Sequence, residues 1–470
     1  MPVENSGGTG AAAKSGLFRM PDGRNLVVTF ALVSSLFLLW GVCNGMIDTM
    51  DKHFQTELGL SKAQSAWVQF AHYLGYFIMA LPAGALASRF GYKGGIIAGL
   101  LMVAVGGFWF LPATHINALA KAGSVSPTTA FIGYLVGVCA IAAGLTFLET
   151  VANPYTTVLG PPRFAATRIN LAQSCNGIGW IFGPIIGAAF FYSKDATTGR
   201  STGNETLYIP YVIVAVVVVV LAVVFYFSDI PDIKTPDDYH LDDSTPSVSH
   251  SIWSHPHFVM GVAAQFFYVA AQAGIFSFFI NYMTSETPTI PSSITSNLLK
   301  SWFEAGKDGT TILSDKGAAN LASLGFFCFL AGRFTGSGLL KKFAAHKILG
   351  LYAFLNVIIC LLIVLKLGWF SVVCVFLSYF FMSIMFPTIF ALGIFGLGIR
   401  AKKASGYIVM AIMGGAILPK LMGAVADKYD MSRGFLVPLF CFAFVSLYGF
   451  LWPKLAKSEG ALEVSTAGGH

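Results

Sequence analysis

Residues 207–228 read LYIPYVIVAVVVVVLAVVFYFS, a run of 22 residues without a single charged side chain. About 20 mostly apolar residues are enough to cross a bilayer as an α-helix. The run therefore predicts a membrane-spanning helix.

The same window, moved along the chain, finds twelve candidate spans. The predicted spans are 26–50, 64–88, 94–113, 129–159, 169–193, 207–228, 258–283, 317–340, 347–366, 369–398, 404–426 and 433–453. We therefore expect an all-α membrane protein with twelve transmembrane helices.

The composition agrees with a membrane protein. Of the 470 residues, 55% are hydrophobic and only 11% are charged, whereas soluble proteins carry about 25% charged residues. The net charge of +7 does not indicate a nucleic-acid partner, because the basic residues sit in short loops and form no stripe with aromatic residues. We predict that membrane lipids surround the chain.

The seven cysteines all fall inside apolar stretches and show no C-x-x-C spacing. They are expected to be small packing residues, and neither a disulfide framework nor a metal site is predicted. Residues 1–24 are polar, and the apolar run that follows is too long for a signal peptide. We expect it to stay as the first span, behind a disordered tail.

Basic residues gather in alternate loops, which fixes the expected orientation. Arg89 and Lys93, Arg163 and Arg168, and the group Arg400, Lys402 and Lys403 mark cytoplasmic loops, so both termini are predicted to be cytoplasmic. Segment 229–257 is rich in Asp, Pro, Ser and Thr and is typical of a linker. The expected organisation is a cytoplasmic tail (1–24), a six-helix half (25–228), a cytoplasmic linker (229–257), a second six-helix half (258–454) and a tail (455–470).

The two halves look like weak repeats. Gly179 precedes Pro184 by the same interval that separates Gly414 from Pro419. Two six-helix halves of the same topology are typical of carriers that work by alternating access, with the solute site between the halves near the midplane.

Several motifs resemble the major facilitator superfamily and, more closely, its fucose permease family of sugar–proton symporters. The loop GALASRFGYK (84–93) is similar to the superfamily's loop signature, with Ser88 where an acidic residue is usual. More specific are GLTFLETVANP (144–154), NLAQSCN (170–176), AQFFYVAAQ (264–272), GRFTG (332–336) and MSIMFPTIF (382–390). The resemblance implies two pseudo-symmetric halves in the major facilitator fold, a monosaccharide substrate and a proton as coupling ion.

Two carboxylates are candidates for proton coupling. Glu149 is the only charged residue between Lys121 and Arg163, and intramembrane acids mark proton or ion pathways by default. The alternative is a structural acid paired with a buried cation such as Arg333. Asp48 lies near the predicted outer end of the first span, where an acid can also simply sit in water. The resemblance implies a coupling role for both acids.

Neutral polar and aromatic residues form the predicted sugar site. Amides both donate and accept hydrogen bonds, as sugar hydroxyls do, and aromatic rings cover the apolar faces of a sugar. The alternative is that amides join helices. The candidates are Asn44, Gln69, Tyr73, Asn153, Gln173, Asn176, Gln265, Tyr268, Gln272, Phe276 and Asn281.

Four more residues have open or structural interpretations. His72 is either a proton carrier or a hydrogen-bonding residue of the packing, and Lys420 is an unexpected cation in the eleventh span. Arg89 and Arg333 are expected to be structural. Met385 and Phe386 stand where fucose permease usually has Gln-Tyr, so the resemblance does not select fucose.

The sequence predicts a proton-coupled symporter that imports a monosaccharide (a hexose, a 6-deoxyhexose or an N-acetylhexosamine) across a plasma or bacterial inner membrane. We expect a monomer with no other cofactor and no enzymatic activity, because no catalytic motif is present. The runner-up is a proton-coupled exporter of small amphipathic molecules, suggested by GWIFGPIIGA (179–188), although small residues at this spacing also serve helix packing.

Overall fold

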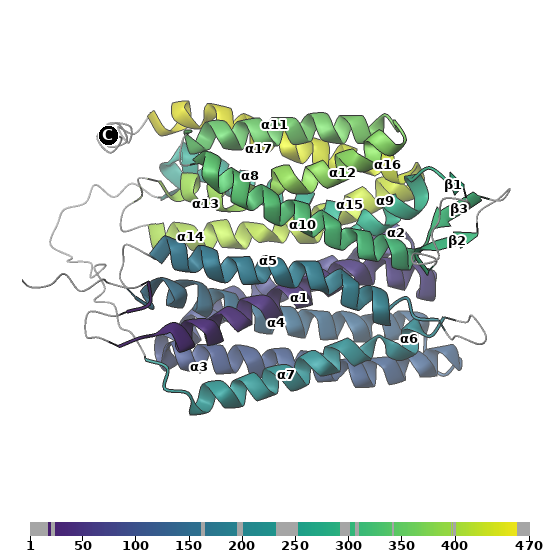
Figure 1. The fold of residues 1–470 in the computed structure, drawn as a ribbon, viewed down its shortest axis with the longest axis horizontal. Coiled ribbons are helices and arrows are strands. Elements are labelled where there is room, and N and C mark those ends of the chain that lie inside the picture. Colours follow the sequence, from purple (N-terminus) through teal and green to yellow (C-terminus); the bar gives the residue numbers. More distant parts are fainter. Residues whose placement is uncertain are drawn as a thin grey trace, which may run out of the picture.

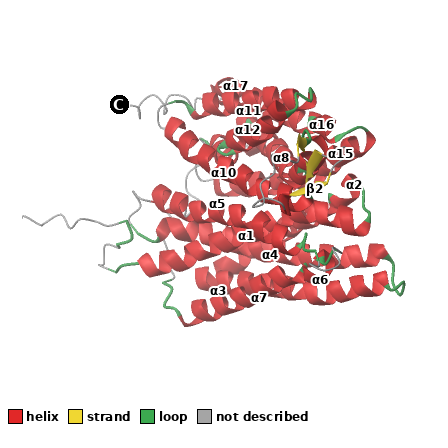
Figure 2. Ribbon diagram, turned by 45° about the vertical axis from the view of Figure 1, so that its right-hand side comes forward, coloured by secondary structure: helices red, strands yellow, loops and turns green. Residues whose placement is uncertain are grey.

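The computed structural model describes residues 17–19, 24–160, 165–194, 201–231, 252–291, 301–305, 310–340, 343–395, 397 and 401–457. The predicted tails and the predicted linker 229–257 lie mostly outside these residues. The described chain is largely helical, and the long helices run side by side along one axis (Figures 1 and 2).

The first half of the chain forms the lower part of the bundle in Figure 1. Its helices are α1 (Val27–Leu58), α2 (Lys62–Ser65), α3 (Trp67–Lys121), α4 (Pro127–Val158), α5 (Ala165–Phe190), α6 (Gly203–Thr206) and α7 (Tyr208–Phe227).

The second half forms the upper part. It contains the 3-10 turn η2 (Ile252–Ser254) and the helices α8 (Pro256–Ser277), α9 (Phe279–Glu286), α10 (Asp315–Leu340), α11 (Ala345–Val364), α12 (Trp369–Met382), α13 (Met385–Ile394) and α14 (Ala401–Met410). The turn η5 (Ala411–Met413) and helices α15 (Gly414–Lys428), α16 (Met431–Gly434) and α17 (Leu436–Lys457) complete it.

These helices account for the twelve predicted spans. Ten helical segments of the described chain are long and apolar enough to cross a membrane, and the first part of α3 and helix α5 run beside them. Helix α3 covers the second and third spans, which separate at Gly91, where φ is 72° and ψ is −178°. Only glycine adopts this backbone conformation readily, so it places a turn between the two spans.

Each half has a hydrophobic core of its own. One core contains buried side chains from residues 26–230, and the other contains side chains from residues 264–456 together with Ala66 and Ala188 of the first half. Most apolar contacts therefore lie within a half.

Glycines allow the closest helix crossings inside each half. A methyl group on Gly179 of α5 would lie 2.3 Å from the carbonyl oxygen of Leu38 in α1, and one on Gly414 would lie 2.0 Å from the carbonyl oxygen of Phe266 in α8. Real Cβ atoms do not approach backbone so closely. The fifth span therefore crosses the first as the eleventh crosses the seventh, which agrees with the repeat seen in the sequence.

One end of the bundle carries α2, α6, α9, α16 and a small sheet, on the right in Figure 1. We call it the outer end, following the predicted orientation. The sheet has the order β1-β3-β2 and consists of β1 (Ile290–Pro291), β2 (Phe303–Ala305) and β3 (Thr310–Leu313), all antiparallel. These strands were not predicted, and they lie in the long loop between the seventh and eighth spans.

Candidate functional site

Asp48 lies well inside helix α1. The predicted span ended at residue 50, but α1 continues to Leu58 and ends at Gly59, whose φ of 64° is left-handed. The carboxyl group of Asp48 is only 8% exposed and accepts a hydrogen bond of 2.9 Å from the side chain of Gln69 in α3. The alternative of an acid in water at a helix end is therefore wrong.

Aromatic side chains of α3 line the same region. Ring centroids of His72 lie 5.1 Å from Tyr73 and 5.0 Å from Tyr76. The Tyr76 hydroxyl accepts a hydrogen bond of 2.7 Å from the indole N–H of Trp40, and it lies close to the amide of Asn44. His72 is buried against two tyrosines, and among the described residues its Nδ1 has no hydrogen-bond partner, so the two interpretations of this residue stay open.

Glu149 of α4 is half-buried on the far side of these tyrosines. Tyr73 lies within electrostatic range of both Asp48 and Glu149, and Tyr76 also lies near Glu149. Within the described part of the chain we find no hydrogen bond or ion pair at Glu149. Asn44, Asp48, Gln69, Tyr73, Tyr76 and Glu149 together form what we call the central cluster.

The proposed structural partner of Glu149 has other contacts. Arg333 of α10 donates a hydrogen bond of 3.4 Å from Nε to the carbonyl oxygen of Ser383. Its guanidinium carbon lies 5.1 Å from the ring centroid of Phe329. These contacts tie α10 to the kink between α12 and α13, which fits the structural role predicted for Arg333.

The amides of α5 make contacts between helices. Gln173 donates a hydrogen bond of 3.0 Å to the side chain of Asn153 in α4. Asn176 donates one of 3.2 Å to the backbone carbonyl of Phe37 in α1. In this conformation both amides serve the helix packing that was the alternative to a sugar contact.

The second half contributes a free amide. Gln265 of α8 is fully buried, and no described residue forms a hydrogen bond with its Nε2 or its Oε1. Such groups are rare, because a buried polar atom without a partner costs free energy. On the same helix face, the hydroxyl of Tyr268 donates to the carbonyl oxygen of Met382 at 3.0 Å, and Gln272 is half-buried.

Aromatic rings join the two halves near the middle of the bundle. The ring of Phe276 lies 4.6 Å from Tyr379 of α12 and 5.5 Å from Trp180 of α5. Tyr73 approaches the second half at Gly415, where a methyl group would lie 2.4 Å from its ring. Sequence analysis missed Trp180 and Tyr379, because an aromatic residue in an apolar span gives no signal of which way it faces.

Three predicted residues lie away from the central cluster. Asn281 of α9 is at the outer end, where it donates a hydrogen bond to Gln55 of α1. Lys420 is exposed and its ammonium lies 3.9 Å from the ring centroid of Trp67. Arg89 is exposed over Phe90 at 5.4 Å.

Comparisons with known proteins agree with this arrangement. A family model described as Major Facilitator Superfamily matches residues 28–393. The chain is 34% identical over 444 residues to the L-fucose-proton symporter of Escherichia coli (strain K12), covering 90% of this chain and 93% of that protein. This chain belongs to the major facilitator superfamily.

Other members of the superfamily are similarly close. The glucose/galactose transporter of Brucella abortus biovar 1 (strain 9-941) is 33% identical over 427 residues, 90% of this chain and 94% of that protein. A crystal structure of the E. coli fucose:proton symporter is 32% identical, with a TM-score of 0.62 over 91% of this chain and 99% of that chain. A second structure of that symporter, in the outward conformation, is 33% identical, with a TM-score of 0.63 over 91% of this chain and 99% of that chain.

At the outer end, polar side chains of one half contact the other half. Asp427 of α15 accepts hydrogen bonds of 3.0 and 2.9 Å from the backbone N–H groups of Lys62 and Ala63, and its carboxylate lies 3.6 Å from the ammonium of Lys62. Asp315 of α10 accepts from the hydroxyl of Thr56 at 3.1 Å. These contacts join the two halves.

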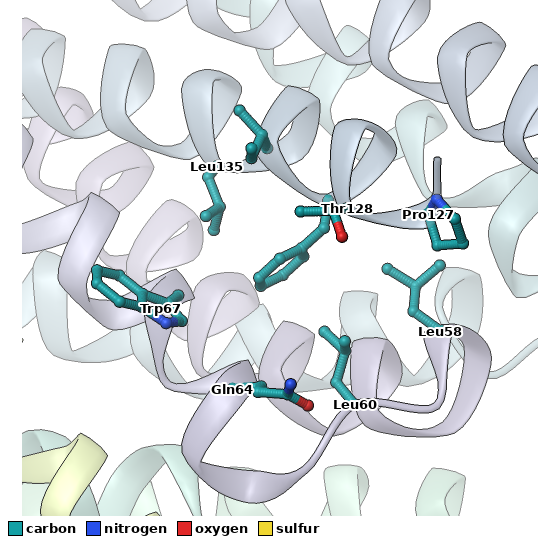
Figure 3. A pocket seen from close by; sticks show the side chains of 9 residues that line it. Leu58, Leu60, Gln64, Trp67, Pro127, Thr128 and Leu135 are labelled. Atoms are coloured by element: carbon teal, nitrogen blue, oxygen red, sulfur yellow. The ribbon is translucent and has the colours of Figure 1, made fainter. Parts of the chain in front are cut away.

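A pocket of about 360 Å³ also lies near the outer end, beside the chain that joins α1 to α3 (Figure 3). Figure 3 shows Leu58, Leu60, Trp67 and Leu135 around it. The polar end of Gln64 accepts a hydrogen bond from the backbone N–H of Ser61. The pocket is thus too poor in free polar groups for a sugar, and it is separate from the central cluster.

Proposed function

We propose that this protein imports a monosaccharide together with a proton by alternating access. The observation that carries the proposal is the central cluster, in which two carboxyl groups lie beside tyrosines and amides at the interface of the halves. The activities of its relatives, L-fucose–proton symport and glucose/galactose transport, support the same substrate class.

The chemistry of the site supports a neutral, hydroxyl-rich solute. Gln265 offers one donor and one acceptor group that are both unused, and a sugar hydroxyl can satisfy both. Trp180, Phe276 and Tyr379 pack on one another in this conformation. We propose that they separate when the site opens, and that the C–H surface of a pyranose then packs against their faces. A hexose, a 6-deoxyhexose and an N-acetylhexosamine all share these features.

The two carboxyl groups are proposed to carry the coupling. A buried carboxylate without a cation is unfavourable, and protonation removes that cost. A proton from outside therefore neutralises Asp48 or Glu149, and the sugar binds between the halves. Closing the outer end then becomes favourable, and the halves rock so that sugar and proton leave inward.

The exporter alternative loses its main support. The residues that suggested it, Gly179, Gly183 and Gly187 of α5, pack directly against α1 at Gly41, Gly45 and Thr49. This spacing therefore serves helix packing. We also propose a cell-membrane location with both termini cytoplasmic, a monomeric carrier, and no cofactor besides the proton.

The proposal is tested by uptake of a panel of radiolabelled hexoses into proteoliposomes, with and without an inward proton gradient. Glu149→Gln keeps the shape of the side chain but removes the charge. We expect wild-type protein to accumulate one sugar with the gradient, and the variant to exchange that sugar without accumulating it. Glu205→Gln, at an exposed position of α6, is the matched control and should accumulate sugar normally.

Two results would contradict the proposal. No uptake of any sugar under any gradient would exclude a sugar symporter and direct the work to export of amphipathic drugs. Normal accumulation by Glu149→Gln would leave the sugar activity intact but remove Glu149 from the coupling.

A further inference from the structure

A third acidic residue lies beside the central cluster, and the sequence analysis did not select it. Asp51 follows Asp48 by three residues on α1, so the two carboxyl groups lie on the same face of the helix, one turn apart. Asp51 is fully buried, and neither carboxyl oxygen has a hydrogen-bond partner in the part of the chain that the structure describes.

Among the described residues, no positively charged group faces Asp51. Its carboxyl group faces Asp48 on its own helix, Gln69 of α3, Ser277 of α8 and Tyr192 in the turn after α5. Gln69 and Ser277 come close, but their geometry falls short of a hydrogen bond, and the Ser277 hydroxyl is itself buried without a partner. Lys52, the next residue in the chain, pairs instead with Asp315 at 3.7 Å.

An ionised Asp51 is incompatible with this arrangement. A carboxylate taken out of water without a cation or hydrogen bonds is strongly disfavoured, and a second carboxyl group nearby increases the cost. The hydroxyl of Tyr192 does not help, because it donates to the backbone carbonyl of Thr49 at 2.8 Å.

The contacts that bury Asp51 come from both halves. Ser277 belongs to the second half, and the polar contacts of Gln55 with Asn281 and of Thr56 with Asp315 lie one turn further out. Opening the outer end separates these elements and admits water to the Asp51 carboxyl group. The protonation of Asp51 and the closure of the outer end are then linked.

We propose that Asp51 is a proton-dependent latch: the outer end closes only when the Asp51 carboxyl group is protonated from the outside. Asp51 is a positioning residue that acts on the conformation, and it exchanges its proton with the outer solution. It therefore makes transport sensitive to the external pH without adding to the number of protons that reach the inside. The inference extends the proposed proton coupling, but its test needs no sugar.

The test measures the opening of the outer end directly. Spin labels are attached at Ser124, in the turn between α3 and α4, and at Ser285 of α9, both of which are exposed, in protein whose seven native cysteines are replaced. Pulsed electron paramagnetic resonance then gives the distance distribution in lipid nanodiscs from acidic to alkaline pH, without sugar.

In the wild type we expect the fraction of protein with the short distance between the labels to decrease as the pH rises. The ratio of closed to open protein should fall about tenfold per pH unit once Asp51 of the open protein is mostly ionised. Asp51→Asn should open much less than the wild type as the pH rises, with only the smaller pH dependence that comes from Asp48 and Glu149. Asp51→Leu should behave in the same way, which covers the case that the first variant folds poorly.

Asp315→Asn is the matched control, because it weakens the contacts with Lys52 and Thr56 without changing Asp51. It should open more at every pH and keep the slope of the wild type. The proposal is overturned if Asp51→Asn opens over the same pH range as the wild type, or if the wild type does not respond to pH. Failure of sugar uptake would leave this result unaffected, so the two proposals can fail separately.

Discussion

The two halves of this transporter share the same helix crossings but carry different functional side chains. In both, a glycine of the fifth helix packs against the backbone of the first helix of that half, at Gly179 and at Gly414. The buried acids Asp48 and Asp51 and the half-buried acid Glu149, however, all belong to the first half. The second half contributes the ring of Tyr268, which lies near Tyr73, and the ring of Phe276, which lies near Trp180. It also carries the buried amide of Gln265.

This difference indicates how coupling can arise from a repeated fold. If one half holds the proton and the other holds most of the sugar, each ligand stabilises its own half. Binding of the proton and binding of the sugar then influence each other only when the two halves come together. Substitutions in the first half should then change coupling, and substitutions in the second half should change affinity.

The largest expected effect tests the shared scaffold. Gly179→Leu and Gly414→Leu both place a side chain where backbone already lies, and overpacking of this kind destabilises a protein by about 3 kcal/mol or more. We expect both variants to lose most folded protein in detergent, as measured by thermal unfolding with size-exclusion chromatography. Gly338→Leu is the control, because nothing lies within 4 Å of its position. If only one of the two variants, Gly179→Leu or Gly414→Leu, loses folded protein, the two glycine crossings are not equivalent.

The next prediction distinguishes the role of the first half from the role of the second half. Asp48→Asn should abolish gradient-driven accumulation while sugar exchange continues. Gln265→Leu should preserve the accumulation ratio but raise KM about tenfold, since it removes up to two hydrogen bonds worth about 0.5–1.5 kcal/mol each. Both are measured by uptake into proteoliposomes.

The control for Gln265 is Asn356→Leu in α11, an amide that is equally buried and equally without partners. It lies in a helix that packs within the second half, so KM should not change. A rise in KM for both variants would mean that the loss of a buried amide, wherever it lies, disturbs the site.

A smaller effect is expected at the outer end. Asp427→Asn weakens the contacts with Lys62 and Ala63 by about 1 kcal/mol, which corresponds to a roughly fivefold shift toward the outward-open state. The spin-label distance across the outer end measures this shift. Glu304→Gln, which breaks the exposed pair with Lys194, should shift it much less, and an equal shift would argue against a special role for Asp427.

The smallest effect is expected for Lys420→Met. Its ammonium lies over Trp67 at the exposed surface, where a cation–π contact contributes about 0.5–1 kcal/mol. Uptake should change by less than about twofold. A complete loss of uptake would show that this cation reaches the transport path in another conformation.

The sequence predicts the twelve spans well, because hydropathy depends on composition over a whole window. It misplaces the end of α1 by eight residues, since Asp51, Lys52 and His53 interrupt the apolar run. That error made Asp48 look like an acid at a helix end and hid Asp51 altogether. Gly59, a good signal for the end of a helix, gives the correct boundary.

The site is harder to predict than the spans. The acids and amides stand out because they are polar in an apolar stretch, whereas Trp180 and Tyr379 look like any other aromatic residue in the membrane. Asn281 also shows a limit of reasoning by residue type. The residue type does not tell whether an amide lies at the outer end of a span or at the midplane. Only the structure shows that Asn281 lies beside Gln55.

The glycine crossings have a mechanical consequence. Backbone packed on backbone has no rotamers to change, so a sliding motion between α1 and α5, or between α8 and α15, meets steep repulsion at once. Each half is therefore stiff along its own repeat. The polar interface between the halves deforms more easily, because its hydrogen bonds can break and re-form one at a time.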